Sequence, residues 1–392
     1  MPDSKENPFS PADLSQMAEL GIDPAEALRQ IELFRNPPPF TRVLRACRVG
    51  DGIRTISKAS EPWLLARFEE AARGGRIAKL VPASGAATRM FKELLADLND
   101  GAQGEPPPEV RTFLENLPRF AFYEDLAGVQ TTDRRSILEH LLTERGLNYA
   151  ELPKGLLKFH RYSDGPRTPF EEHLVEAADV TRDAEGNCRL HFTVSPQHQE
   201  RFEALLEEVR RRYEERYDCR FQVSFSCQRR STDTIAVDPE DRPFRQDDGT
   251  LLFRPGGHGA LLDNLASLAG LGWDLVLLKN IDNVVPDERK PAVNGWKKAL
   301  SGHLLALQER IFRALERLEA DPAALDEAAR LVEEELSRPI PAGVDRRQFV
   351  VDALSRPLRV CGVVRNQGEP GGGAVLGGGR SRAGLPADRG EL

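Results

Sequence analysis

The chain has 392 residues, a formal net charge of -8, and 40% hydrophobic and 30% charged residues. This length allows one large domain or two to three smaller ones, and the composition is typical of globular proteins. The sequence has no dense block of Lys and Arg and no apolar run of 18 residues. These absences argue against a general nucleic-acid surface and against a membrane span.

The cysteines are scattered, with no CxxC or Cys/His ligand spacing, and the N-terminal segment lacks the basic and apolar regions of a signal peptide. An odd, scattered set of cysteines is typical of reduced thiols rather than of a disulfide framework. Together with the missing signal peptide, this pattern predicts a cytoplasmic protein. The five cysteines are Cys47, Cys188, Cys219, Cys227 and Cys361.

The first 75 residues predict a helical preface that packs on the main domain. Apolar residues recur at helical spacing over 11–35, and a break separates two helices at Asp23 and Pro24. Asp23 is placed as an N-cap and Pro24 as the first helical residue. A further helix is predicted over 61–73, and we expect no catalytic residue in this region.

A strand-to-helix turn is predicted around residues 83–88, a run of small residues that follows Pro82. We expect a strand before the turn and a helix over 90–98 after it. Such a turn allows backbone amides and a helix N-terminus to face an anion, and Arg89 is placed to donate two hydrogen bonds to a phosphate. Taken alone, the stretch fits an ordinary tight turn equally well.

Residues 93–150 predict helical pieces, which we expect to form an insertion. The next helix is predicted to begin after Thr168, which is placed as its N-cap, with Glu171 completing a capping box. Glu172 and His173 follow directly, but they are not spaced as a metal-binding pair on one helix face. The pattern therefore favours charges at the start of a helix.

Strand and helix patterns alternate in the segment that ends near residue 285. Short apolar runs that alternate with helical periodicity predict an α/β domain with a mostly parallel sheet. The predicted strands are 190–194, 221–225, 235–237, 251–253 and 275–278, and the predicted helices between them are 197–213 and 260–268.

From Trp296 the pattern becomes helical, with leucines at helical spacing up to Leu318 and a second helix capped by Asp321. Residues 358–364 are predicted to return to the sheet. The remaining tail has little apolar content and is predicted to be disordered. The predicted organisation is a helical preface at 1–75, an α/β domain at 76–290 with a helical insertion at 93–150, a helical segment at 291–365 and an aberrant tail at 366–392.

Three loops are expected to converge, because ligands bind at the carboxyl ends of parallel strands. They are the turn 84–89, the glycine-rich turn 256–259 and the loop with Asp282, which follows an apolar strand. A carboxylate at a strand end suits Mg2+ bridging phosphates, and Lys154 and Lys158 add positive charge. The alternatives are an N-cap or turn for 257–259, a strand-end cap for Asp282 and a solvated charge for Lys154.

The same stretches resemble motifs of known enzymes. Residues 81–89 resemble the glycine-rich signature of sugar nucleotidyltransferases, and 152–157 resemble the lysine segment that follows it, here after a long insertion. Residues 255–259 and 280–283 are similar to two motifs of the UDP-sugar pyrophosphorylases, in the same order and spacing, and 191–196 match their strand-and-cap segment. More closely, the run from 81 to about 370 resembles a bacterial family of uncharacterised proteins allied to these pyrophosphorylases.

The resemblance implies a Rossmann-like nucleotidyltransferase (glycosyltransferase-A-like) fold, with a mixed, mostly parallel sheet and helical additions at both ends. It also implies Mg2+-dependent transfer of a nucleotidyl group from a nucleoside triphosphate, with UTP favoured, to a sugar 1-phosphate with release of pyrophosphate. The resemblance implies that the triphosphate is bound by Ser84, Gly85, Ala86, Ala87, Thr88 and Arg89. It implies that Lys154 neutralises charge at the α-phosphate and that Asp282 binds Mg2+. It implies nucleotide binding by Gly256, Gly257 and His258.

Two departures from the family pattern leave an alternative open. Ser84 and Ala87 stand where the signature usually has glycine, and after 369–373 the expected sugar-binding section gives way to Gly/Arg/Ala/Pro-rich sequence. This change predicts a truncation or a reading-frame change. The alternative is therefore a nucleotide-binding protein without turnover. A P-loop phosphotransferase and a dehydrogenase are disfavoured, because GxxxxGK[ST] and a GxGxxG first turn are missing. The sugar and the oligomeric state stay open.

Overall fold

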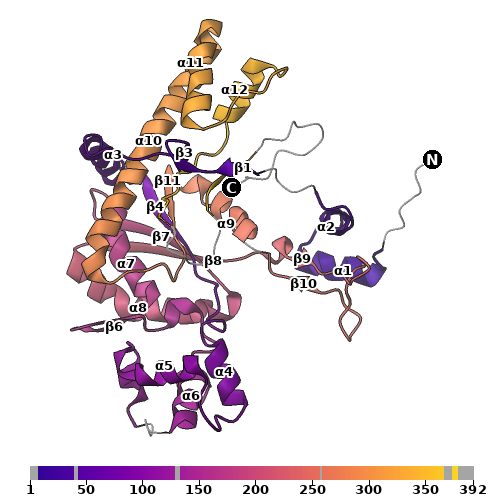
Figure 1. Ribbon diagram of the computed structural model, residues 1–392, viewed down its shortest axis with the longest axis vertical. Helices are drawn as coiled ribbons and strands as arrows, with labels where there is room; N and C mark the ends of the chain where they lie inside the picture. Colours follow the sequence, from indigo (N-terminus) through magenta and orange to yellow (C-terminus); the bar gives the residue numbers. More distant parts are fainter. Residues whose placement is uncertain (1–7, 39–42, 129–132, 257, 366–372, 378–392) are drawn as a thin grey trace. The chain divides into compact units, whose positions relative to one another are not determined.

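The computed structural model describes residues 8–38, 43–128, 133–256, 258–365 and 373–377 (Figure 1). The chain divides into two compact units. The first unit comprises Met1–Arg35 and Glu69–Gly295, and the second comprises Asn36–Phe68 and Trp296–Leu392. The predicted preface of 1–75 is thus divided between the two units.

A four-stranded sheet lies at the centre of the first unit, with the strand order β11-β4-β7-β8. All three neighbouring pairs are parallel. The chain passes from β4 to β7 and β8 in one direction and then returns to β11 on the other side of β4, so the direction of winding changes between β4 and β11. The strands are β11 (Leu275–Leu278), β4 (Ile77–Pro82), β7 (Asn187–Val194) and β8 (Arg220–Cys227). This arrangement confirms the predicted mixed α/β architecture.

Helices α7 (Pro169–Val180) and α8 (Gln199–Tyr217) share an apolar core with the sheet. The Phe170 and Phe192 ring centroids lie 4.7 Å apart, and Phe202 packs against the same ring of Phe170. Strands in a parallel sheet are buried on both faces, which explains why β4 and β7 consist largely of buried residues. This core fixes the strands whose carboxyl ends carry the predicted site.

The capping box predicted at the start of α7 is present. The Glu171 amide donates to the Thr168 hydroxyl at 3.3 Å, and the Thr168 amide donates to the Glu171 carboxylate at 2.8 Å. Each side chain thereby satisfies an amide that the first helical turn leaves without a partner.

A helical insertion follows β4 and has an apolar core of its own. It contains α4 (Lys92–Asn99), α5 (Pro108–Glu115) and α6 (Arg134–Leu142). The prediction of a helix from residue 90 was wrong at its start, because residues 87–91 form a turn in which the Met90 amide donates to the Ala87 carbonyl at 2.8 Å. The insertion therefore begins with a turn, not with a helix aimed at the loop after β4.

Two helices near the N-terminus, α1 (Pro11–Leu20) and α2 (Pro24–Arg35), form a small core with the antiparallel pair β9 (Thr234–Ile235) and β10 (Phe253–Arg254). The predicted break between the helices is confirmed, and the Asp23 carboxylate accepts from the Ala25 amide at 2.9 Å. Asp13 of α1 forms a two-pronged ion pair with Arg245, and this interaction lowers the pKa of Asp13 to about 2.

The second unit consists mainly of helices, and its core is formed by side chains of α10, α11 and α12. Residues 358–364, which were predicted to return to the sheet, form no strand. Of the predicted tail 366–392, only residues 373–377 are described. They include β12, which pairs antiparallel with β1. The elements that lie within this unit are β1 (Val43–Ala46), β2 (Arg48–Val49), β3 (Gly52–Ile53), α11 (Leu325–Arg330), α12 (Arg346–Leu354) and β12 (Val375–Gly377). The helices α3 (Glu61–Arg73) and α10 (Lys290–Ala320) belong to it in part.

None of the helices in the described part of the chain combines the length and the apolar character that a membrane crossing requires.

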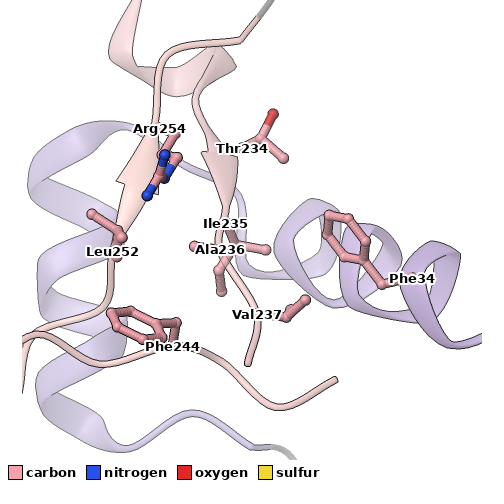
Figure 2. A pocket seen from close by; sticks show the side chains of 8 residues that line it. All are labelled: Phe34, Thr234, Ile235, Ala236, Val237, Phe244, Leu252 and Arg254. Carbon is pink, nitrogen blue, oxygen red and sulfur yellow. The ribbon is translucent and has the colours of Figure 1, made fainter. Parts of the chain in front are cut away.

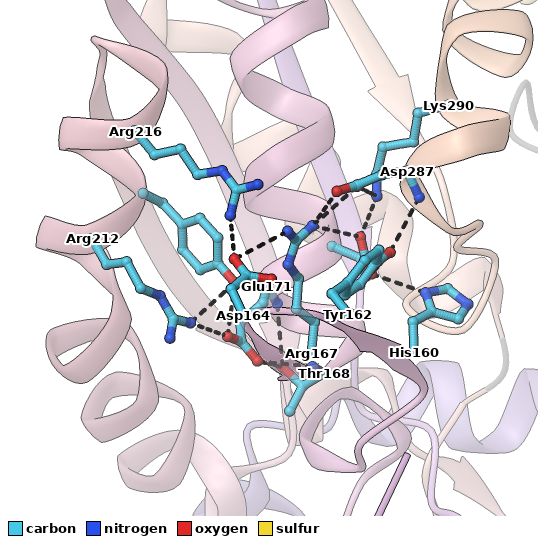
Figure 3. A network of polar contacts seen from close by, with 12 residues as sticks. His160, Tyr162, Asp164, Arg167, Thr168, Glu171, Arg212, Arg216, Asp287 and Lys290 are labelled. Carbon is cyan, nitrogen blue, oxygen red and sulfur yellow. Dashed lines mark hydrogen bonds and ion pairs between the residues drawn. The ribbon is translucent and has the colours of Figure 1, made fainter. Parts of the chain in front are cut away.

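A network of charged side chains is buried at the start of α7 (Figure 3). Its centre is Arg167, at the end of the hairpin formed by β5 (His160–Tyr162) and β6 (Gly165–Arg167). The guanidinium lies 2.9 Å from the Asp287 carboxylate and 4.0 Å from the Tyr162 ring centroid. The Tyr162 hydroxyl in turn donates to Glu172 at 2.6 Å.

Glu172 is the buried anion of this network. Burial alone would raise its pKa, but hydrogen bonds from His160, Lys290 and Tyr162 outweigh burial and lower it below the ordinary value. Because the carboxylate stays ionised and fully hydrogen-bonded, the network holds the hairpin, α7 and the start of α10 in one arrangement.

Replacing Arg167 with leucine should lower the free energy of unfolding by about 3 kcal/mol, because the substitution removes the buried guanidinium that pairs with Asp287 and lies over the Tyr162 ring. Lys290 still pairs with both Asp287 and Glu172 in this variant. Urea denaturation measures this loss. Arg211→Ala is the matched control: Arg211 is exposed on α8 and pairs with Glu215, so its loss should change the free energy of unfolding far less. Equal effects of the two substitutions would show that the network does not hold the fold together.

Candidate functional site

The loop that follows β4 is held by backbone hydrogen bonds on two sides. The Ala83 amide donates to the Thr193 carbonyl of β7 at 2.7 Å. The Lys154 amide donates to the Gly85 carbonyl at 3.0 Å, and the Ala87 amide donates to the Leu152 carbonyl at 3.2 Å. The predicted small-residue turn and the predicted lysine segment are therefore neighbours, although a helical insertion separates them in sequence.

Three consecutive residues of this loop, Ser84, Gly85 and Ala86, are exposed. Their backbone amides donate no hydrogen bond to any other residue that the structure describes. These exposed amides are available as hydrogen-bond donors to an anion. Arg89 is also exposed and forms no ion pair within the described residues.

Two parts of the predicted phosphate loop differ from the expectation. The predicted helix N-terminus is not at the loop, because α4 begins only at Lys92. Ala87 is fully buried in the core of the helical insertion, and the Thr88 hydroxyl donates to the Ala150 carbonyl at 3.3 Å. The side chains of Ala87 and Thr88 thus attach the loop to the insertion, and the amides of residues 84–86 are left as the open donors.

Lys154 and Asp282 form an ion pair at this edge of the sheet. The Lys154 ammonium lies 2.6 Å from the Asp282 carboxylate, and the side chains are 25% and 32% exposed. Lys154 is next to the loop after β4, and Asp282 follows β11, so the pair bridges the point where the sheet changes its direction of winding. Ligands of open α/β sheets bind at such a point.

The backbone around Asp282 is fixed from two sides. The Lys279 and Ile281 amides donate to the carbonyls of Leu80 and Pro82 at 3.2 and 3.1 Å. On the other side, the Nε2 atom of His173 lies 3.1 Å from the Ile281 carbonyl oxygen. Because a carbonyl only accepts, this nitrogen carries the hydrogen.

His173 is fully buried, and burial, followed by the positive charge of Lys79, lowers its pKa well below the ordinary value. The imidazole is therefore neutral at neutral pH. The sequence pattern suggested a charge at the helix start, whereas the structure has an uncharged hydrogen-bond donor that supports the loop with Asp282.

Two lysines share one buried carboxylate beneath the site. The fully buried Lys79 ammonium, from the centre of β4, lies 2.6 Å from Glu176 of α7. Glu176 also pairs with Lys279, at the end of β11. The predicted site did not include this cluster, and its signal in the sequence is a lysine within an otherwise apolar strand.

Other predicted site residues lie apart from the Lys154–Asp282 pair. Lys158 is paired with Asp125 of the insertion at 2.6 Å. Gly256 follows β8, the strand at the other end of the sheet order from β11. A Cβ added at Gly256 would come within 2.7 Å of the Thr232 carbonyl oxygen. Gly257 is outside the described residues, and the side chain of His258 is not described, although its backbone begins a short 3-10 helix.

A divalent cation at this site would need ligands besides the protein. Among the described residues, no group of three or more His, Cys, Asp or Glu side chains is arranged to hold a metal ion. Mg2+ often uses one or two carboxylates and takes its other oxygens from phosphates and water. The single, half-buried carboxylate of Asp282, close to the exposed loop after β4, fits this second arrangement.

Two grooves of the described surface lie elsewhere. One, of about 460 Å³, lies between α2 and the β9–β10 pair (Figure 2) and is lined mainly by apolar side chains, including Phe34, Val237 and Phe244. None of the predicted site residues lines this groove or its neighbour near Arg245.

The parallel sheet, with exposed amides and a lysine–aspartate pair at its carboxyl edge, defines an α/β protein with a candidate phosphate-binding edge. A family model described as "Domain of unknown function (DUF4301)" matches residues 10–380, and the chain belongs to this family.

One solved structure similar to this chain is the uridine diphosphate N-acetylglucosamine pyrophosphorylase from Trypanosoma brucei, determined in complex with an inhibitor. The two are 17% identical with a TM-score of 0.42, and the match covers 73% of this chain and 49% of that chain. This chain thus spans about half the length of that protein. No curated protein matches the chain.

The buried neutral state of His173 predicts a loss of stability in mild acid. Below a histidine pKa of 6.5, the unfolded chain binds a proton that the folded chain excludes, so the free energy of unfolding falls as the pH decreases. The contribution is about 1.4 kcal/mol for each pH unit below that value.

Urea denaturation at about pH 7.5 and about pH 5.5 measures this loss. The variant His173→Gln keeps an N–H donor for the Ile281 carbonyl but cannot be protonated, so it should lose less stability between the two pH values. The same loss in both proteins would mean that His173 does not contribute to the acid sensitivity.

Proposed function

We propose that this protein binds a nucleoside triphosphate at the carboxyl edge of the sheet and transfers its nucleotidyl group to a sugar 1-phosphate, with release of pyrophosphate. The observation that carries the proposal is the Lys154–Asp282 ion pair beside the exposed amides of residues 84–86. The motif resemblance favours UTP as the nucleotide. The strand order, with its change of direction between β4 and β11, supports a Rossmann-like topology for the binding edge.

In this proposal the loop after β4 binds the triphosphate. The amides of Ser84, Gly85 and Ala86 donate to phosphate oxygens, and the Arg89 guanidinium donates two hydrogen bonds. All four residues are exposed, so a phosphate reaches them without displacing another protein group. Ala87 and Thr88 hold the loop on the insertion, and Gly256, Gly257 and His258 contact the base and the nucleotide.

Asp282 and Lys154 have separate roles once the nucleotide is bound. Asp282 would hold Mg2+, which neutralises phosphate charge. Lys154 contacts the α-phosphate and stabilises the negative charge that develops there during transfer. Without nucleotide the two side chains neutralise each other at 2.6 Å, so neither is left as an unpaired, partly buried charge.

The reaction is an in-line substitution at the α-phosphorus. A phosphate oxygen of the sugar 1-phosphate forms the new bond, the bond to the bridging oxygen of the β-phosphate breaks, and pyrophosphate leaves with the electron pair. The chain contributes by holding the two phosphates in line and by stabilising charge.

Calorimetric titration with UTP and the other triphosphates, with and without Mg2+, tests the binding site. We expect Mg2+-dependent binding of UTP, and a loss of affinity of about tenfold or more in Arg89→Ala and in Asp282→Asn, because each removes a charge-assisted contact. Lys92→Ala is the matched control, since Lys92 is an exposed cation at the start of α4. No triphosphate binding, or equal binding by all variants, would contradict the site.

Pyrophosphate release in the presence of UTP and a panel of sugar 1-phosphates tests the transfer step. Lys154→Met should lower the rate about 100-fold while it weakens UTP binding much less, because Lys154 acts on charge that develops during transfer. UTP binding without pyrophosphate release would identify the alternative, a nucleotide-binding protein without turnover. Release of inorganic phosphate or of a nucleoside diphosphate would indicate a phosphotransferase.

A further inference from the structure

A chain of hydrogen bonds connects α9 (Leu261–Ser267) with β8 and β7. The Asn264 amide nitrogen donates to the Ser226 hydroxyl at 2.7 Å and to the Cys227 carbonyl at 3.1 Å. The Ser226 hydroxyl lies 2.8 Å from Nε2 of His191, and Nδ1 of the same ring lies 2.7 Å from the Ser224 hydroxyl. Asn264 and His191 are both buried.

The direction of these hydrogen bonds follows from the donors. The Asn264 amide nitrogen can only donate, so the Ser226 oxygen accepts from it and has its own hydrogen left to donate. Burial lowers the pKa of His191, which keeps the ring neutral with one bare nitrogen. The Ser226 hydrogen has an acceptor within the chain when Ser226 donates to Nε2, and Nδ1 then carries the ring hydrogen and donates to Ser224. In this arrangement both Asn264 amide hydrogens, the Ser226 hydrogen and the ring hydrogen each have an acceptor.

The attachment of α9 includes a polar contact at the centre of its packed face. Asn264 is the one fully buried residue of the helix, and Leu261 and Leu265 beside it are half-buried. Losing the bond to Ser226 would leave a buried amide hydrogen unsatisfied, which costs more than losing an exposed hydrogen bond. The position of α9 on β8 thus depends on a polar anchor as well as on apolar packing.

The segment before α9 contains Gly256, which is closely packed as well. A Cβ on Gly256 would lie 2.7 Å from the Thr232 carbonyl oxygen and 3.0 Å from the Ala260 Cβ. Gly256 lies between residues that follow β8 and the start of α9. It is therefore at the carboxyl ends of the strands, as Lys154 and Asp282 are. From β11 to β8 there are three strand spacings, about 14 Å in total, which an extended nucleoside triphosphate spans.

We infer that His191, Ser226 and Asn264 are positioning residues. They hold α9, and with it Gly256, at the carboxyl end of β8, where Gly256 meets the base end of the nucleotide. The link to the nucleotide rests on the proposed function, whereas the anchoring of α9 does not.

The test uses the full chain with Ser226→Ala, which removes the central hydroxyl, and Ser226→Thr, which keeps it. The matched control is Ser267→Ala, because Ser267 lies on α9 itself and its hydroxyl bonds only within that helix, to the Asn264 carbonyl. Thermal unfolding verifies that each variant is folded.

The first measurement does not involve nucleotide. Amide hydrogen exchange over residues 259–268 should be about tenfold faster in Ser226→Ala and unchanged in Ser226→Thr and Ser267→Ala. In the wild-type chain, ¹⁵N chemical shifts of the His191 ring should show hydrogen on Nδ1 and a bare Nε2. Unchanged exchange in Ser226→Ala, or the same increase in Ser226→Thr, would overturn the anchoring role. Hydrogen on Nε2 would overturn the direction assigned to the His191–Ser226 hydrogen bond.

The second measurement is UTP affinity in the presence of Mg2+. It should fall about tenfold in Ser226→Ala and stay within about twofold in Ser226→Thr and Ser267→Ala. If Ser226→Ala loosens α9 and UTP binds with unchanged affinity, the link to the nucleotide is wrong. If the wild-type chain binds no triphosphate while Ser226→Ala still loosens α9, the proposed function fails and the anchoring role stands.

Discussion

The buried charge of Lys79 is the constraint on which the arrangement of the site depends. An ammonium group at the centre of a parallel sheet is tolerated only beside an anion, and Glu176 supplies that anion from α7 at 2.6 Å. This contact determines where α7 crosses β4. Residues three apart lie on the same face of a helix, so the position of Glu176 also places His173 against the loop with Asp282. The geometry of the exposed site thus follows from a charge pair beneath it.

The polar groups of the first unit fall into two kinds with different consequences. Around Arg167 and Glu172, cations and anions are buried together and pair with one another. The loop after β4 shows the opposite, since the amides of residues 84–86 and the Arg89 side chain are exposed and without partners among the described residues. The first kind stabilises the fold, and the second kind is available for binding.

Local sequence signals predicted much of the fold. The predicted strand at 275–278 coincides with β11, and the capping box at Thr168 forms as expected, because both depend on neighbouring residues. Prediction was wrong where distant contacts decide the structure. Residues 358–364 have an apolar pattern but form no strand, and the start of α4 is delayed by a turn that hydrogen bonds to the insertion hold in place.

The candidate site was predictable in part. Lys154 and Asp282 were proposed from their motifs, and the structure brings them together across 128 residues of sequence. Lys79, His173 and Glu176 were missed as a group because their roles arise only when α7 packs on the sheet. The chain through His191, Ser226 and Asn264 was missed for the same reason, since three separate elements contribute to it.

The strand order has a consequence for the order in which the protein forms. β4 lies between β7 and β11, and β11 follows β4 in sequence only after a long separation, as the contact between Arg76 and Asp274 across 198 residues illustrates. Contacts between residues so far apart form late and slowly, because a long loop must close first. On a ribosome, the loop after β4 is complete long before Asp282 has been synthesised. The emerging chain therefore carries Lys79 and Lys154 for much of its synthesis without the edge strand that completes the site.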